Sequence, residues 1–538
     1  MSDELPFPSP FDIQASGRDL SDFLTEDVFG KGMNDSEDYE AEAVNRVTHA
    51  TEPTSFSQQN QGGIFSLLAT LQSVFDPLIG KESDASSSSQ EKSLLYVAKK
   101  FNDNVNNTLK ATEQDSNTQD MDKFWTLLDE CKKQWSTVAK DSKVKDIAPL
   151  AFMYFVGFEE SRKTPSYRRR EHRFYPSLEN MDTLYDLHDA LYLATISYLN
   201  KVDDITNALN DFKGSPWVMV YCEVTSQPRQ PAHFICVKKE HTTIQDGKGF
   251  RFPWQKEEAL DVLMVVRGTK EISDILSDAL IETTPYDGGL AHAGIQQSGK
   301  YLVEKHTSLL RTLLKESKRD KIRLSIIGHS LGAGAGAIAA IEFNKLDHFE
   351  AKVIAFGCPP VLSKELSEST KDYITTVVCD SDVVPRMSGA TISNVVMEVM
   401  SRPYKDMAMC DVHQILDAID SNSPIKLSKE QRNYILNYIE TGLDEEYEKY
   451  KVEYNPLDVV LYPPGKCLHL YRDGVGVSAT YVPCTFFKEI DVTRTMLLDH
   501  GTSDGYDSIF HEMMRGHLKQ IHFNFPHDIE KATSPQTA

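Results

Sequence analysis

The feature that most constrains this chain is a glycine-flanked serine between an apolar strand-like run and a helix of very small residues. The segment reads KIRLSIIGHSLGAGAGAIAA over 321–340, with Ser330 at the centre of Gly-His-Ser-Leu-Gly. A strand that turns sharply into a helix forces the serine at the turn into a strained conformation and exposes its hydroxyl above the sheet. The pattern predicts that Ser330 is a nucleophile; an ordinary turn serine is the alternative.

A serine hydroxyl is a poor nucleophile unless a base accepts its proton and an acid orients that base. In α/β-hydrolases the acid and then the histidine follow the serine along the chain, each after a later strand. Asp380 and Asp382 both follow the expected strand 374–378, and we favour Asp382, which begins DVVPR. His500, in TMLLDHGTSDGY, lies downstream of the last expected strand. Spacing alone leaves three rival bases open, which are His469, His511 and His517.

An oxyanion formed during acyl transfer needs hydrogen-bond donors close to the nucleophile. The backbone N–H of Leu331, directly after the serine, is the first expected donor. The second should come from a loop after an earlier strand, and strand 260–266 ends in Arg-Gly-Thr. There Gly268 permits a tight turn, and Thr269 offers a backbone N–H and a hydroxyl. The alternative for Thr269 is a helix cap.

From residue 215 onward, short β-branched runs alternate with helical segments. The expected strands are residues 217–221, 234–237, 260–266, 322–327, 353–356, 374–378, 459–462 and 485–490. Such alternation predicts a mainly parallel sheet with helices on both faces. The expected fold class is therefore α/β, of the α/β-hydrolase type, with a helical N-terminal extension and a helical insertion.

The chain divides into five expected parts. They are a disordered acidic N-terminus (1–60), an amphipathic segment with a Ser-rich linker (61–90), a helical region (91–214), the hydrolase domain (215–525) with its helical insertion (390–455), and a polar tail (526–538). The first part carries 13 acidic and 3 basic residues and is rich in Ser, Asp, Asn and Pro, which is typical of disorder.

Five blocks of the sequence resemble the lipase class 3 family. They are VVRGTKEISDILSDAL, AHAGI, GHSLGAG, DSDVVPRMS and MLLDHGTSDGY, and their spacing, with LYPPG at 461–465, is closest to the diacylglycerol-lipase-like branch. The resemblance implies an α/β-hydrolase that cleaves ester bonds of acylglycerols without a cofactor. It also implies that Ser330 is the nucleophile, Asp382 its acid partner and His500 the base, with Thr269 and Leu331 lining the oxyanion hole.

The family resemblance further implies a lid directly after the oxyanion block, at residues 270–281. Apolar residues recur there at helical spacing opposite acidic and polar ones, so one face of the helix can cover an apolar cleft. The residues expected to contact substrate from this lid are Ile272, Ile275, Leu276 and Leu280.

The charge and cysteine content limit the partners of this chain. With 57 basic and 80 acidic residues the net charge is −23, which repels phosphate backbones, so we expect no nucleic-acid partner. The eight cysteines form no CxxC pair and no metal-ligand spacing, so we expect a reducing compartment and no metal site. The N-terminal residues lack the pattern of a secretory signal, and no apolar run is long enough to span a bilayer. We therefore expect a cytoplasmic protein.

Two segments favour peripheral contact with a membrane or lipid-droplet surface. Residues 62–80 form an apolar helical stripe, which either docks on the catalytic domain or enters neutral lipid. Residues 147–158 are apolar on all sides and precede an Arg-rich cluster at 162–173. They form either a buried core helix or a segment at a lipid headgroup boundary.

The leading hypothesis is a serine lipase that hydrolyses triacylglycerol or diacylglycerol through an acyl-enzyme. A phospholipase A or galactolipid acyl hydrolase is the alternative within enzymes, because the cluster at 162–173 suits a phosphate headgroup. A non-catalytic lipid-surface scaffold, using 62–80 and 147–175, is the alternative of another class. The expected partner in every case is lipid.

Overall fold

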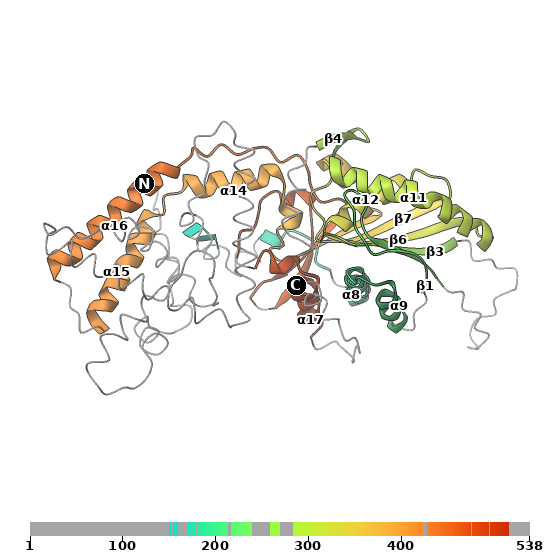
Figure 1. The fold of residues 1–538 in the computed structure, drawn as a ribbon, viewed down its shortest axis with the longest axis horizontal. Helices are drawn as coiled ribbons and strands as arrows, with labels where there is room; N and C mark the ends of the chain where they lie inside the picture. The colour runs from blue at the N-terminus through green and yellow to red at the C-terminus, as the bar shows by residue number, and fades with distance from the viewer. Residues whose placement is uncertain are drawn as a thin grey trace, which may run out of the picture. The chain divides into compact units, whose positions relative to one another are not determined.

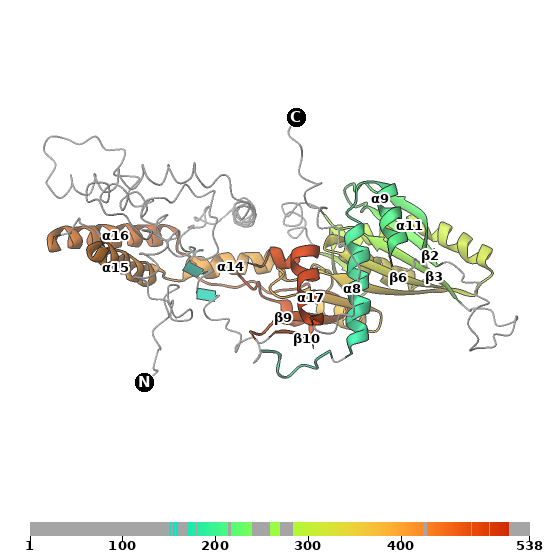
Figure 2. The same cartoon turned by 90° about the horizontal axis from the view of Figure 1, so that it is seen from below.

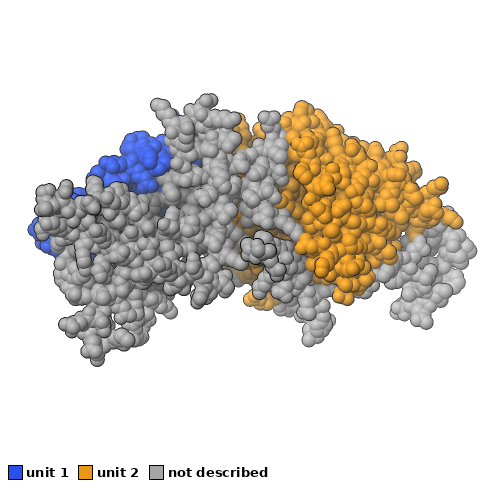
Figure 3. Space-filling view, viewed as in Figure 1, with its two compact units in different colours: residues 1–164, 393–456 blue, residues 165–392, 457–538 orange. Residues whose placement is uncertain are grey.

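The computed structural model describes residues 151–159 in part, 171–178, 180–212, 217–238, 259–269, 283–422, 428–474, 476–493 and 495–515. They belong to two compact units, residues 1–164 with 393–456 and residues 165–392 with 457–538 (Figure 3). The expected segments 1–60, 61–90 and 526–538, and the lid at 270–281, lie outside the described residues. The expected domain boundaries stay predictions.

The unit of residues 165–392 and 457–538 is built on an eight-stranded sheet in the order β1-β2-β3-β6-β7-β8-β9-β10. The strands are β1 (Trp217–Glu223), β2 (His233–Lys238), β3 (Ala259–Val266), β6 (Lys321–His329), β7 (Phe349–Phe356), β8 (Ile374–Cys379), β9 (Lys466–Arg472) and β10 (Val477–Val482). Strands β3, β6, β7, β8 and β9 run parallel, whereas β1, β2 and β10 pair antiparallel at the two sides. The mainly parallel sheet expected from the sequence is confirmed.

Helices cover both faces of this sheet (Figures 1 and 2). Helices α11 (Ala293–Ser317) and α12 (Leu331–Phe343) pack on one face, and α8 (Met181–Ile196), α9 (Val202–Asp211) and α17 (Ser508–Met514) pack on the other. Strand β3 shows why both faces of the sheet need a covering layer. Successive side chains of a strand point to opposite faces, and those of β3, apart from Asp261, are apolar on both. Val262 and Met264 belong to the core under α11 and α12, whereas Leu263 and Val265 belong to the core under α8. A strand buried on both faces reads as a continuous apolar run.

Two of the expected strands are wrong. Residues 459–462 make only an isolated bridge between Leu362 and Tyr462, and residues 484–487 form a 3-10 helix. The last two strands are instead β9 and β10, between these segments. The prolines at 463 and 464 explain the first error, because proline has no N–H for a ladder and ends the apolar run before it can pair.

A small hairpin, β4 (Thr283–Tyr286) and β5 (Gly289–His292), was also missed. Its turn is Asp287-Gly288, and both residues have positive φ, 50° and 82°. Asp-Gly between two short strands is a strong signal for such a two-residue turn, so the sequence carried the information.

The unit of residues 1–164 and 393–456 is helical where it is described. It contains α15 (Lys405–Asn422), α16 (Lys429–Tyr450) and most of α14 (Gly389–Ser401). The described residues of the apolar segment 147–158 are helical, and Tyr154 and Phe155 are buried in this unit. The ring of Tyr154 stacks on that of Tyr404. These contacts match the core-helix interpretation. Among the helices that the structure describes, none is long and apolar enough to cross a bilayer.

A buried pair of histidines joins β2 to α11 and makes the stability of the fold depend on pH. The Nε2 atoms of His233 and His306 are 2.6 Å apart, and His233 Nδ1–H donates to the carbonyl of Pro231. Burial lowers the pKa of His233 to about 4 and that of His306 to about 3. Both rings are therefore neutral in the folded protein at pH 6.

We expect the free energy of unfolding to fall as the pH is lowered from 6.5 towards 4. In the unfolded chain both histidines titrate near 6.5, so in that range the unfolded state binds more protons than the folded state. The loss is up to about 1.4 kcal/mol per histidine and pH unit. Urea unfolding at a series of pH values measures it. The double variant His233→Phe/His306→Leu should reduce the slope; an unchanged slope would contradict the assignment to this pair.

Candidate active site

Ser330 occupies a strained turn between β6 and α12. Its backbone angles are φ 57° and ψ −132°, which lie outside the regions that an L-residue ordinarily adopts. The turn is held by a 2.8 Å hydrogen bond from the Ser330 N–H to the carbonyl of Phe356, at the end of β7. Ser330 stands at the N-terminus of α12, where the helix dipole favours negative charge.

His500 and Asp382 are in contact. His500 Nδ1 lies 3.0 and 3.1 Å from the two carboxylate oxygens of Asp382, whose side chain is completely buried. The carboxylate also accepts hydrogen bonds from the Val384 N–H (2.9 Å) and the Tyr506 hydroxyl (2.7 Å). A carboxylate facing Nδ1 keeps the proton on that nitrogen, so Nε2 of the neutral ring is left as the acceptor. The two side chains therefore form an oriented acid–base pair.

The elements that carry Ser330, Asp382 and His500 meet at Gly357, which directly follows β7. Gly357 has φ +55°, and a Cβ there would lie 2.9 Å from both Asp382 Oδ2 and His500 Nδ1. Only glycine fits such a position. The structure records no hydrogen bond between Ser330 and His500. Among the described residues, Ser330 Oγ and His500 Nε2 are both buried and have no hydrogen-bond partner. Catalytic contacts of this kind often tighten only when substrate binds.

The structure places the rival residues elsewhere. Asp380 forms an ion pair with Arg472, with Oδ2 and Nη1 3.1 Å apart. His469 contacts the His172 ring and the backbone carbonyl of Asp380. His511 approaches Asp507, and His517 lies outside the described residues. Of the two candidate acids, Asp382 is thus the one that reaches His500.

The turn after β3 lies against Ser330. A Cβ on Gly268 would be 2.8 Å from Ser330 Cβ and 2.5 Å from the carbonyl oxygen of His329. Thr269 follows this turn and Leu331 follows Ser330, so the two expected oxyanion donors come from neighbouring segments. The expected lid residues Ile272, Ile275, Leu276 and Leu280 lie outside the described residues.

Sequence reasoning missed a hydrogen-bonded chain that links Tyr198, in the turn after α8, to the backbone of His500. His329 Nε2–H donates to the His500 carbonyl (2.8 Å), so His329 Nδ1 accepts from the Tyr198 hydroxyl, also at 2.8 Å. Burial, with the nearby His500, lowers the pKa of His329 to about 3 and keeps the ring neutral. The Tyr198 hydroxyl also lies against Gly268. The Tyr198 hydroxyl therefore connects the turn at Gly268, the turn at Ser330 and the segment of His500.

A second buried acid, Asp499, precedes His500 and was also missed. Its Oδ2 accepts hydrogen bonds from the Ser381 N–H (3.1 Å) and the Thr495 hydroxyl (2.9 Å). Burial raises its pKa to about 6. Asp499 therefore links the segment of His500 to the loop of Asp382. The structure shows no hydrogen bond between Asp499 and the His500 imidazole.

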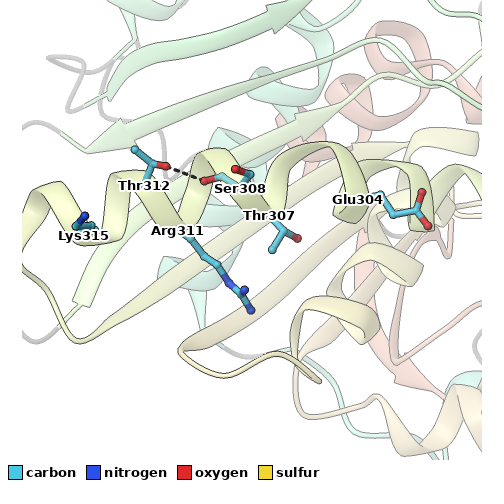
Figure 4. Close-up of a pocket in the computed structure, with 6 residues that line it drawn as sticks. All are labelled: Glu304, Thr307, Ser308, Arg311, Thr312 and Lys315. Atoms are coloured by element: carbon cyan, nitrogen blue, oxygen red, sulfur yellow. Dashed lines mark hydrogen bonds between the residues drawn. The ribbon is translucent and has the colours of Figure 1, made fainter.

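A shallow depression elsewhere on this unit lies along α11 (Figure 4). Its lining residues are Glu304, Thr307, Ser308, Arg311, Thr312 and Lys315. All six come from one helix, and none of them is part of the Ser330 cluster. We assign it no function.

Comparison with known proteins agrees with this geometry. Residues 263–392, which include Ser330 and Asp382, match the family model of lipase (class 3). Over 274 residues the chain is 27% identical to diacylglycerol lipase-beta of Mus musculus, covering 44% of this chain and 40% of that protein. Over residues 263–392 the chain is therefore similar to the lipase (class 3) family.

Another curated relative matches over a shorter span. Diacylglycerol lipase-alpha of Homo sapiens is 32% identical over 139 residues, covering 23% of this chain and 13% of that protein. The chain thus spans less than half the length of these curated relatives. Among solved structures, the Rhizomucor miehei lipase propeptide complex matches at 11% identity with a TM-score of 0.37, covering 62% of this chain and 84% of that one.

Proposed function

We propose that this chain is a serine lipase of the class 3 type that hydrolyses carboxylic ester bonds of acylglycerols, with diacylglycerol or triacylglycerol as substrate. The observation that carries the proposal is the acid–base pair of His500 and Asp382, in one buried cluster with the strained Ser330. The similarity to diacylglycerol lipases supports the substrate class.

In the proposed reaction, His500 Nε2 accepts the proton of Ser330 as its hydroxyl oxygen attacks the ester carbonyl. Asp382 holds the imidazole through Nδ1 and stabilises the imidazolium that forms. The backbone donors of Leu331 and Thr269 bind the oxyanion, with the N-terminus of α12 adding positive potential. His500 then returns the proton to the leaving alcohol, and water attacks the acyl-enzyme by the same route. No step needs a cofactor.

Peripheral contact with lipid belongs to the same proposal, because a lipase must extract its substrate from a membrane or lipid droplet. Among the described residues of the segment 147–175, Phe174 is 77% exposed and lies beneath the Arg173 guanidinium. An exposed aromatic ring beside arginine is typical of a headgroup boundary. The proposed location is the cytoplasmic side of such a surface.

The proposal is tested by measuring fatty-acid release from emulsions of dioleoylglycerol, triolein, phosphatidylcholine and a monogalactosyl diacylglycerol, with Ser330→Ala as the control. We expect release from the two acylglycerols to exceed release from the polar lipids. Preference for phosphatidylcholine or galactolipid would instead assign a phospholipase or galactolipase. Failure to release any fatty acid, together with no labelling by a fluorophosphonate, would favour the scaffold.

We expect Tyr198→Phe to lower kcat about 10- to 100-fold while KM changes little, because small displacements of catalytic groups cost rate rather than binding. The substitution removes only the hydroxyl that links His329 and Gly268, so it acts on positioning. Tyr192→Phe is the matched control, because it removes a hydroxyl of α8, six residues earlier in the chain, that donates to the Ala208 carbonyl. Equal effects of the two variants on kcat would rule out a positioning role for Tyr198.

A further inference from the structure

Three side chains that the proposed reaction does not use converge on the face of the sheet covered by α8. They are His188 on α8, Asp507 at the end of the π-helix η7 (Thr502–Asp507), and His511 on α17. His188 Nε2 lies 2.8 Å from Asp507 Oδ1, and His511 Nε2 lies 3.4 Å from the same oxygen. One ligand atom from each residue lies within 4.8 Å of the others.

These separations suit a shared cation. Ligand atoms bound at roughly 2.0 to 2.1 Å to one transition-metal ion lie about 2.9 to 3.4 Å apart in octahedral or tetrahedral geometry. The two measured contacts to Asp507 Oδ1 are close to this range. Two imidazole nitrogens and one carboxylate oxygen form a ligand set that favours zinc and its first-row neighbours over magnesium or calcium.

The surroundings hold the ligands in place and leave one side accessible. The side chains of His188 and Asp507 are 3% and 4% exposed, whereas that of His511 is 47% exposed. The His188 ring also packs against Phe510, which is fully buried in the core under α8. Two ligands are thus fixed by the core, and the third reaches them from the surface, where solvent can complete the coordination.

We propose that His188, Asp507 and His511 bind a divalent transition-metal ion of the zinc type. The ion would join α8 to the π-helix and to α17, the segments that directly follow His500 in the chain. The site departs from the sequence-based expectation of no metal. Asp507 and His511 are four residues apart and share a helix face, but His188 is 319 residues distant from Asp507 and comes to them only in the folded chain. The proposal does not depend on the lipase activity.

The test is titration of the metal-free full-length protein with Co²⁺ and Zn²⁺, followed by visible absorption, calorimetry and thermal unfolding. We expect one ion per chain with a visible Co²⁺ spectrum, and a rise in Tm with Zn²⁺ because the ion binds only the folded state. His511→Ala should weaken binding at least about a hundredfold, since even outer-sphere partners of a metal site contribute 10- to 100-fold.

Two further variants separate a metal site from a simple buried hydrogen bond. Asp507→Asn keeps an acceptor for His188 but is a poorer ligand, so it should also abolish stoichiometric binding. His413→Ala removes an exposed histidine from α15 and should bind as wild type does. Because His511 is exposed, its alanine variant should fold even if Asp507→Asn does not. Equal metal affinity of wild type and His511→Ala, or no stoichiometric binding by wild type, would overturn the proposal.

Discussion

Ser330→Ala is expected to lower kcat for acylglycerol hydrolysis at least about a thousandfold, the usual scale for loss of a triad serine. The removed hydroxyl is fully buried and makes no hydrogen bond to any described residue. Its loss therefore takes no stabilising contact from the fold, and alanine occupies the same strained backbone position. The measurement is fatty-acid release from dioleoylglycerol under saturating substrate.

Two readouts separate loss of chemistry from loss of structure in this variant. The thermal unfolding midpoint should equal that of wild type, and labelling by a fluorophosphonate should disappear, because the reagent needs the serine oxygen. Turnover within about tenfold of wild type would remove Ser330 from the mechanism. A large fall in Tm would show that the variant is misfolded, and the loss of rate would then come from the fold and not from the missing hydroxyl.

Asp382→Asn is expected to lower kcat by about four orders of magnitude, the scale seen when the acid of a serine triad becomes an amide. The amide NH₂ cannot accept the Nδ1–H of His500, so the ring is no longer held in the tautomer that leaves Nε2 as the base. The variant keeps the size of the side chain and retains an acceptor for the Tyr506 hydroxyl or the Val384 N–H. Single-turnover acylation measures the effect.

Two matched variants test whether kcat depends on direct contact between the acid and His500 or only on a negative charge nearby. Asp499→Asn removes a buried acid from the adjacent residue, where burial already raises the carboxyl pKa to about 6, and should reduce kcat less than about tenfold. Asp380→Asn loses the ion pair with Arg472 and should also be mild. A larger loss from either variant than from Asp382→Asn would reassign the acid.

The sequence predicted the parallel sheet because a central strand such as β3 is buried on both faces and reads as a nearly continuous apolar run, interrupted only by Asp261. It failed at β9 and β10, where polar residues interrupt short strands: β9 is mostly buried but contains His469, and β10 is only partly buried. The register and strand order depend on which runs pair, and pairing is a property of the folded chain.

By itself, the sequence determined the strained turn at Ser330, because a glycine-flanked serine between a strand and a small-residue helix has few ways to fold. Before the family resemblance entered, it favoured Asp382 over Asp380 as the acid and His500 over three other histidines as the base. The tertiary structure adds the contacts of the two acids, because Asp382 faces His500 whereas Asp380 faces Arg472.

The tertiary structure also decided every contact between distant parts of the chain. Tyr198 meets His329 across 131 residues, and Tyr506 meets Asp382 across 124 residues. The spacing of residues in the sequence predicts which of them share a face of one helix or strand, because side-chain directions repeat every few residues within such an element. A hydrogen bond between elements depends instead on how strands and helices pack in three dimensions. The residues that hold the site in place, such as Tyr198 and Tyr506, could therefore be identified only from the three-dimensional structure.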